Sequence, residues 1–100
     1  MLKKDLLELC LLQLLSGGDK YGYEVLTPLR SAFPDTQESA IYALLRGLGR
    51  DKLTEWYMAP GGGGPDRKYY RITPAGRERL DVLRAGWRNM RDAIASFGVE

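Results

Sequence analysis

The strongest constraint on the fold is a regular apolar spacing near the end of this 100-residue chain. The spacing runs at intervals of three, four, three, four and three residues, typical of the a/d seam of paired helices, through Leu80, Leu83, Trp87, Met90, Ile94 and Phe97. Thr73 provides an N-cap and Pro74 a first helical position, so we expect one long helix to about Phe97. One small domain leaves little to cover this stripe, and soluble monomers rarely expose a large apolar patch. The six residues therefore predict a two-fold homodimer interface.

Three earlier segments predict further helices. Residues 2–15 carry leucine on nearly every side, which favours a core helix that a partner chain can also cover. A second helix is expected from about Lys20 to Phe33, with Pro28 inside it. Either Pro28 bends that helix, or the helix begins late and Pro28 lies near its first turn. A third helix is expected over residues 37–50, capped by Asp35 or Thr36.

Two β-like segments follow, at residues 53–58 and 67–72, and the Pro/Gly tract PGGGGP (60–65) joins them. Short strands around such a loop predict a hairpin. Alternation places Tyr70 and Ile72 of the second strand on the core face, and Arg67, Tyr69 and Arg71 on an exposed face.

The glycine tract is not a nucleotide-binding loop. A phosphate-binding loop needs Lys-Ser or Lys-Thr and a helix immediately after its glycines, whereas here Pro65 and a strand follow. We expect a flexible wing tip that carries no side chains to read bases; a plain loop that contacts nothing is the alternative. Arg67 and Lys68, just beyond the tip, are the better candidates for phosphate contacts.

The order helix, helix, helix, strand, loop, strand, long helix is that of a winged helix-turn-helix. The predicted fold is mainly α with a small β-hairpin. Residues 1–73 form the winged helix-turn-helix and residues 74–100 a C-terminal dimerisation helix, the two making one compact unit.

Three segments resemble the PadR family of bacterial transcriptional regulators, and the resemblance covers nearly the whole chain. They are YGYEVLTPLR (21–30), SAIYALLRGL (39–48) and RKYYRITPAG (67–76), of which the last is the most specific. The single C-terminal helix is similar to that of the small-subfamily members. The resemblance implies a homodimer, a palindromic double-stranded DNA operator and repression, relieved in some members by phenolic or planar drug-like ligands.

The polar face of the third helix is the predicted DNA-reading surface. Near its N-terminus, Glu38 and Ser39 are candidates for base edges, since glutamate can accept a hydrogen bond from cytosine N4. Arg46 can fork onto guanine or a phosphate, and the resemblance implies a phosphate or base-stacking contact for Tyr42. The second strand adds Arg67, Lys68 and Arg71. For the helix residues, the alternative is an ordinary solvated helix face.

Trp87, next to Gly86, also raises a ligand hypothesis. A flat aromatic effector could stack between Trp87 and its symmetry mate, while the alternative assigns Trp87 to the dimer core alone. A winged-helix module that binds protein and no specific DNA is the competing function.

Composition argues against enzymes and metal sites. The chain has no histidine and one cysteine, Cys10, which lies in a leucine-rich run and is expected to be a buried thiol. Zinc fingers and Cys-His nucleophiles are therefore excluded, and we expect no catalytic residue, metal or cofactor. No apolar run approaches a membrane span, and acidic Asp5 and Glu8 interrupt the leader-like N-terminus. These features predict a cytoplasmic location and no membrane partner.

Overall fold

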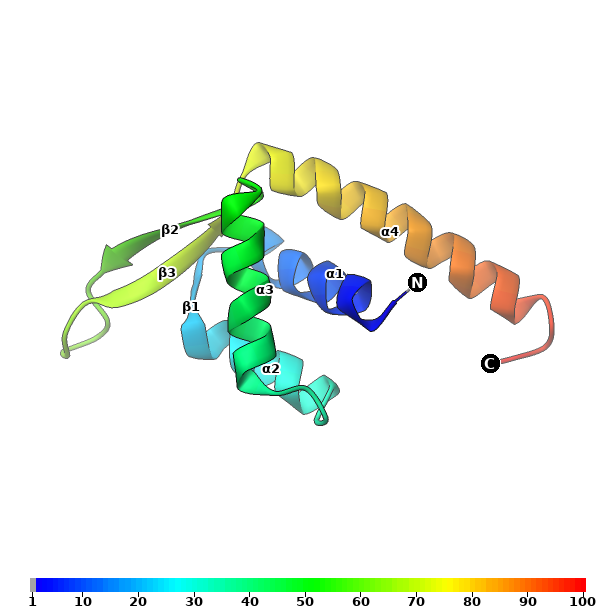
Figure 1. Ribbon diagram of the computed structural model, residues 1–100, viewed down its shortest axis with the longest axis horizontal. Helices are drawn as coiled ribbons and strands as arrows, with labels where there is room; N and C mark the ends of the chain where they lie inside the picture. The colour runs from blue at the N-terminus through cyan, green and yellow to red at the C-terminus, as the bar shows by residue number, and fades with distance from the viewer. Residues whose placement is uncertain (1) are drawn as a thin grey trace.

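The computed structural model describes residues 2–100 and is mainly helical, with a small antiparallel sheet (Figure 1). Its elements are α1 (Lys3–Ser16), β1 (Lys20–Tyr21), α2 (Gly22–Ala32), α3 (Glu38–Arg50), β2 (Thr54–Ala59), β3 (Arg67–Ile72) and α4 (Pro74–Ala95). The predicted helices, hairpin and long C-terminal helix are all present. Across the described residues no helix is both long enough and apolar enough to cross a membrane.

The sheet has three strands where the sequence predicted two. Its order is β1-β3-β2, and the additional strand pairs Lys20 with Tyr70 and Tyr21 with Tyr69. The second helix, expected from about Lys20, begins at Gly22, because Lys20 and Tyr21 form β1. Two residues are too few for an alternating pattern to be visible, and their pairing partner lies far along the chain. Pro28 lies well inside α2 and not near its first turn, while a bend at Pro28 stays a prediction.

One core joins all four helices to the sheet. It contains Leu11, Leu12 and Leu15 of α1, Val25, Leu26 and Leu29 of α2, Ile41, Leu45 and Leu48 of α3, Tyr70 and Ile72 of β3, and Leu80 and Leu83 of α4. The buried leucines of α1, Leu7, Leu11, Leu12 and Leu15, lie on one side of the helix, while Leu9 and Leu14 are half-buried and pack against the core. The core face predicted for Tyr70 and Ile72 is confirmed. Cys10 is half-buried, and burial raises the pKa of its thiol.

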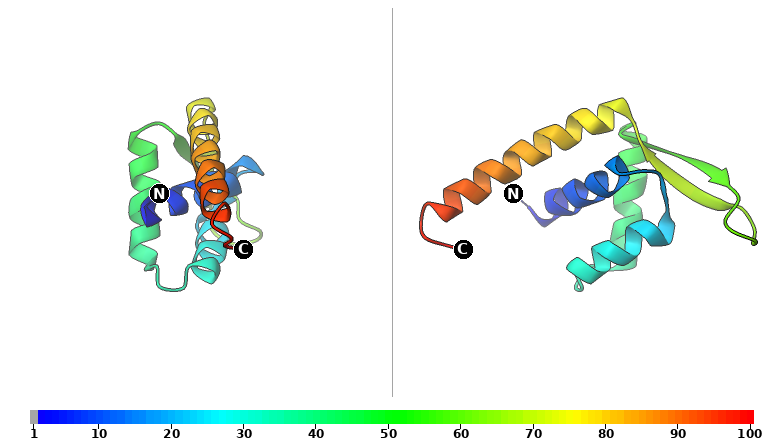
Figure 2. Two further views of the ribbon diagram at one scale, coloured as in Figure 1. Left: turned by 90° about the vertical axis from the view of Figure 1, so that its right-hand side faces the viewer. Right: turned by 180° about the vertical axis from the view of Figure 1, so that it is seen from behind.

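The predicted α4 stripe divides into two parts. Leu80 and Leu83 are only 1% and 4% exposed, because α1 of the same chain packs against them. Their assignment to a dimer interface is therefore corrected: they belong to the chain's own core. Beyond them α4 runs past α1 (Figures 1 and 2) and ends at Ala95, so Phe97 lies just after the helix.

The start of α4 is hydrogen-bonded to the segment between α3 and β2. The Thr73 hydroxyl accepts a hydrogen bond from the Gly76 N–H at 3.0 Å and donates one to the Lys52 carbonyl at 2.8 Å. The Thr73 N–H donates to the Leu53 carbonyl at 3.0 Å. The predicted Thr73 cap and Pro74 start are confirmed. At α3, in contrast, the N-cap is Gln37 and no side chain caps it, so Asp35 and Thr36 do not have the predicted role.

Candidate nucleic-acid interface

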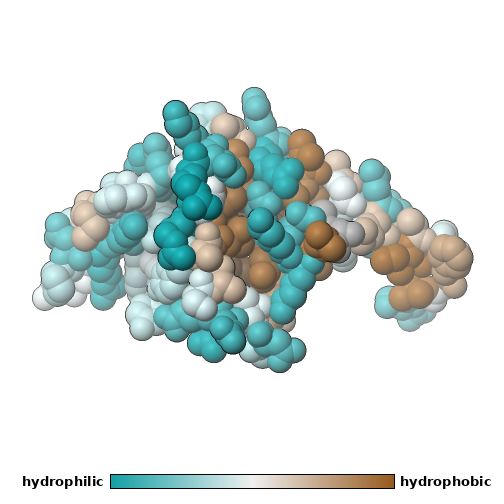
Figure 3. Space-filling model, viewed as in Figure 1, coloured by the Kyte–Doolittle hydropathy of each residue, from teal (hydrophilic) through white to brown (hydrophobic). Residues whose placement is uncertain are grey.

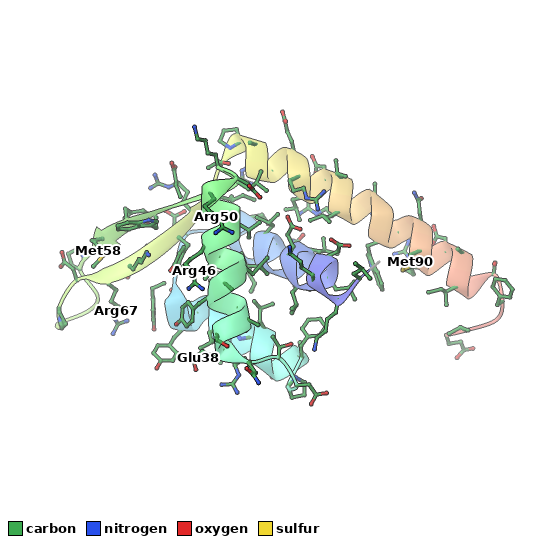
Figure 4. All side chains as sticks on the ribbon, in the orientation of Figure 1. Glu38, Arg46, Arg50, Met58, Arg67 and Met90 are labelled. Atoms are coloured by element: carbon green, nitrogen blue, oxygen red, sulfur yellow. The ribbon has the colours of Figure 1, made fainter. Side chains whose placement is uncertain are left out.

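The outer face of α3 is polar because the apolar positions of this helix fall on one side. Ile41, Leu45 and Leu48 are buried, at the spacing of one helix face. Glu38, Ser39 and Arg46 are exposed and Tyr42 is half-buried. Figure 4 places Glu38, Arg46 and Arg50 in succession along this helix. All four residues predicted on this helix are therefore at or near its surface.

Glu38 is not an isolated carboxylate. Its Oε2 lies 3.9 Å from Nη1 of Arg30 on α2, and both side chains are about half exposed. An exposed pair of this kind contributes little to stability. It does place a positive charge beside Glu38 at the N-terminal end of α3.

The two faces of the hairpin carry different cations. Cross-strand register pairs Trp56 with Tyr70 and Met58 with Lys68, so these four side chains share a face. The Lys68 ammonium lies 4.3 Å from the centre of the Trp56 ring and 5.6 Å from that of Tyr70. Arg67 alternates to the opposite face. The two adjacent basic residues are thus held by different aromatic neighbours.

On the opposite face, three tyrosines join the three strands; we refer to Tyr21, Tyr57 and Tyr69 as the tyrosine stack. Tyr69 stacks on Tyr57 with ring centres 5.6 Å apart and meets Tyr21 edge-on at 5.9 Å. The Arg67 guanidinium lies 4.5 Å from the centre of the Tyr21 ring. Contacts of this kind stabilise by about 0.5–1.5 kcal/mol each. The stack ties β1 to the wing and holds Arg67 at one end.

Arg71, at the other end of the stack, is engaged within the chain. Its Nε lies 3.3 Å from Asp19 and its Nη1 3.7 Å from Glu55, while its guanidinium covers the Tyr57 ring at 4.7 Å. The Tyr57 hydroxyl donates a hydrogen bond to the same Asp19 oxygen at 2.6 Å. Asp19 raises the pKa of Arg71, and its hydrogen bond raises the pKa of Tyr57. Arg71 therefore fixes the base of the wing, although the sequence suggested a DNA contact.

A cavity of about 440 Å³ lies where α2, α3 and β3 meet. It is lined by Tyr21, Gly22, Tyr23, Tyr42, Arg67, Lys68 and Tyr70. A Cβ at Gly22 would lie 3.2 Å from the Tyr42 hydroxyl, so glycine allows this close approach. Burial raises the pKa of Tyr42, with a contribution from Glu38, and burial also raises the pKa of Tyr70. Both hydroxyls therefore remain protonated donors at neutral pH.

The cavity brings together only part of the predicted set. Tyr42, Arg67 and Lys68 line it; Glu38, Ser39, Arg46 and Arg71 do not. Sequence reasoning missed Tyr21, Gly22 and Tyr23, although they stand together as YGY at the start of a segment already notable for its family resemblance. No group of three or more His, Cys, Asp or Glu within residues 2–100 could hold a metal ion.

The outer part of α4 carries the exposed apolar surface. Trp87 is 41% exposed, Ile94 45% and Phe97 87%, while Met90 is half-buried. Val82 and Val99, which the a/d spacing did not include, are also exposed. In Figure 3 apolar surface gathers beside α3 and again near the C-terminal end of α4. Trp87, Ile94 and Phe97 are thus the exposed members of the predicted stripe.

The chain is similar in sequence and in fold to known proteins. A family model described as the transcriptional regulator PadR-like family matches residues 11–82. The chain is similar to a PadR-like transcriptional regulator from Bacillus cereus, whose crystal structure superposes with a TM-score of 0.87 at 34% identity. That match covers 97% of this chain and 95% of the other.

Two further proteins are similar to this chain. A Streptococcus transcriptional regulator superposes with a TM-score of 0.85 at 33% identity, covering 96% of this chain and 95% of its own. "Uncharacterized protein X" of Lysinibacillus sphaericus is 30% identical over 94 residues, covering 91% of this chain and 86% of that protein.

Proposed function

This chain belongs to the PadR-like family of transcriptional regulators, and we propose that it is a homodimeric repressor binding a palindromic operator. In this proposal α3 enters the major groove and the hairpin reaches the neighbouring backbone. The roles given to single residues of α3, β3 and α4 are part of the proposal.

The observation that carries the proposal is the meeting of two polar surfaces. The exposed face of α3 and the basic start of β3 adjoin at the cavity lined by Tyr42, Arg67 and Lys68. Glu38 and Ser39 lie at the N-terminus of α3, from which base edges are usually read. Arg46, one turn after Tyr42 and exposed, can fork onto guanine or a phosphate.

The dimer rests on the exposed part of α4. Trp87, Met90, Ile94 and Phe97 continue the stripe beyond the α1 contact, and a two-fold axis would pack each stripe on its copy. A symmetric dimer presents two recognition helices, which fit half-sites about 34 Å apart. The two-fold symmetry of such a dimer is the reason for proposing a palindromic operator.

The stripe also supplies a route for regulation. A planar aromatic effector stacked on Trp87 at the two-fold axis would change the angle between the two α4 helices. Recognition helices moved out of register would bind the operator less well, and repression would be relieved. Fluorescence of Trp87 titrated with aromatic compounds tests this part, and the absence of any saturable change would remove the effector.

The DNA-binding part is tested with Arg46→Ala and a duplex from the promoter of the protein's own gene. Loss of one specific contact should cost about 1–3 kcal/mol of binding free energy. Arg88→Ala, on the part of α4 turned away from the stripe, is the matched control and should bind normally. Wild-type affinity should also fall by about 0.9 log units per log unit of salt for each phosphate neutralised. No salt-dependent binding at all would favour the protein-binding module instead.

The dimer is tested by Trp87→Asp and sedimentation. The buried carboxylate should dissociate the dimer while circular dichroism still reports a helical chain, because Trp87 lies outside the protomer core. A folded variant that remains dimeric would place the interface elsewhere.

A further inference from the structure

Arg67 is confined between a glycine and an aromatic ring. Gly61, at the start of the glycine tract, is buried, and a Cβ there would overlap the Cγ, Cδ and Nε atoms of Arg67. On its other side the guanidinium rests on the Tyr21 ring. The side chain is solvent-exposed, yet its direction is set by these two neighbours.

The glycines of the tract have different physical roles. Gly62 and Gly63 adopt φ values of 63° and 91°, which favour glycine because L side chains are strained there. Gly64 has no such φ, and no atom lies within 4 Å of the place that a Cβ would take. Gly61 is therefore the position of the tract where space for Arg67 requires glycine, and the tip is not simply a featureless flexible loop.

Arg67 and Lys68 both line the 440 Å³ cavity, and the protonated Tyr42 hydroxyl lies there too. The residues that line it include no carboxylate. Two cations and neutral phenol donors around an open cavity form an environment for an anion with several acceptor oxygens. The cavity adjoins α3, so a DNA strand leaving the major groove would pass over it.

We propose that this cavity seats one backbone phosphate of the operator and that Gly61 is the positioning residue that directs Arg67 toward it. This inference rests on the proposed function. Arg67 and Lys68 supply the charge, the Tyr42 hydroxyl donates to a phosphate oxygen, and Gly61 acts only through Arg67.

Substitutions distinguish the role of Gly61 from the roles of Arg67 and Gly64. Arg67→Ala and Gly61→Ala should each weaken DNA binding about tenfold, as loss of one charge-assisted hydrogen bond predicts. The double variant should be no weaker than Arg67→Ala alone. Each single variant should reduce the slope of log affinity against log salt concentration by about 0.9. Gly64→Ala is the matched control and should leave affinity and slope unchanged. Gly61→Ala should fold normally, because a flexible side chain can move away from the added methyl.

Uncharged methylphosphonate linkages then identify the phosphate. The linkages are placed one at a time through a half-site. The linkage that replaces the phosphate bound in the cavity should weaken wild-type binding about tenfold, as loss of one charge-assisted hydrogen bond predicts. The same linkage should not weaken binding by Arg67→Ala any further. Inorganic phosphate is then titrated as a competitor, with chloride at the same ionic strength as the control. Phosphate should displace DNA no more than chloride does.

Each result has a defined meaning. Normal DNA binding by Gly61→Ala beside weakened Arg67→Ala would overturn the role of Gly61. Additive losses for Arg67→Ala at every methylphosphonate position would overturn the phosphate seat. Phosphate-specific displacement would instead assign the cavity to a small anion. Wild-type protein that binds no DNA would overturn the proposed function, and the seat with it.

Discussion

Replacing Gly76 by alanine should destabilise this protein more than the same change at Gly22, Gly47 or Gly49 of the other helices. Gly76 is buried in the first turn of α4, and its added Cβ would overlap the Leu53 carbonyl oxygen and Cγ1 of Ile72. A carbonyl fixed in the backbone cannot rotate away as a side chain can. The same oxygen already accepts the Thr73 N–H. The start of α4 must therefore shift.

The magnitude follows from the contacts at this junction. A shift weakens the Thr73 cap, which contributes about 1 kcal/mol, and the Thr73–Leu53 hydrogen bond, which contributes a similar amount. Overpacking in the core costs a further 1–3 kcal/mol, roughly, and the better helix propensity of alanine returns up to about 1 kcal/mol. The net loss should be about 2–5 kcal/mol, against a total stability of roughly 5–15 kcal/mol for a domain.

Urea unfolding followed by tryptophan fluorescence measures this loss, at one fixed protein concentration because a dimer's stability depends on it. Gly49→Ala is the control. It lies near the end of α3 with no atom within 4 Å of an added Cβ, so it should be neutral or gain up to about 1 kcal/mol. Equal unfolding midpoints for Gly76→Ala and wild type would refute the reasoning, because they would mean that the junction accommodates a methyl.

Other predictions test single contacts. Glu8 is 7% exposed and both its oxygens accept hydrogen bonds from Arg79, at 3.2 and 3.1 Å, so Glu8→Gln should lower the free energy of unfolding in urea by about 1–2 kcal/mol. Asp81→Asn, in the exposed pair with Arg84, should lower it by under about 0.5 kcal/mol. Equal losses for the two variants would contradict the role of burial. Arg71→Ala should lower stability yet keep the wild-type salt slope on DNA, and a slope reduced as in Arg67→Ala would return Arg71 to the interface. The pKa of Tyr70 is raised by burial and that of Tyr57 by its bond to Asp19, so the folded state favours both protonated phenols. The stability this provides should be full below about pH 10 and fall as pH rises through the folded-state pKa values, and an unfolding midpoint unchanged across that range would argue against it.

Local patterns predicted most of the fold because they depend on residues that are close together in the sequence. The helices carry amphipathic spacing, and Thr73-Pro74 is a local start signal that the structure confirms. The a/d spacing of α4 could not reveal that Leu80 and Leu83 face α1. A periodic stripe looks the same whether its own chain or a partner covers it.

The candidate site was predictable one element at a time. The polar face of α3 follows from its own apolar spacing, whereas the cavity requires Tyr21, Tyr42 and Arg67 from three separate elements. Arg71 looked like a free cation because its partner Asp19 is 52 residues away in sequence. Gly61 looked like part of a flexible tract because only the folded hairpin brings the Arg67 side chain against it.

The rigid junction at Thr73 and Gly76 makes α4 a lever. Twenty-two residues at 1.5 Å each give a helix about 33 Å long, so a tilt of about 5° at its start moves its far end by about 3 Å. In the proposed dimer the far ends of the two α4 helices are held at the two-fold axis. The same rotation would then displace each recognition helix by a similar distance, close to one base-pair step of about 3.4 Å. Substitutions at the junction should therefore change which half-site separation is preferred, and a set of duplexes with spacers lengthened by single base pairs would detect that change.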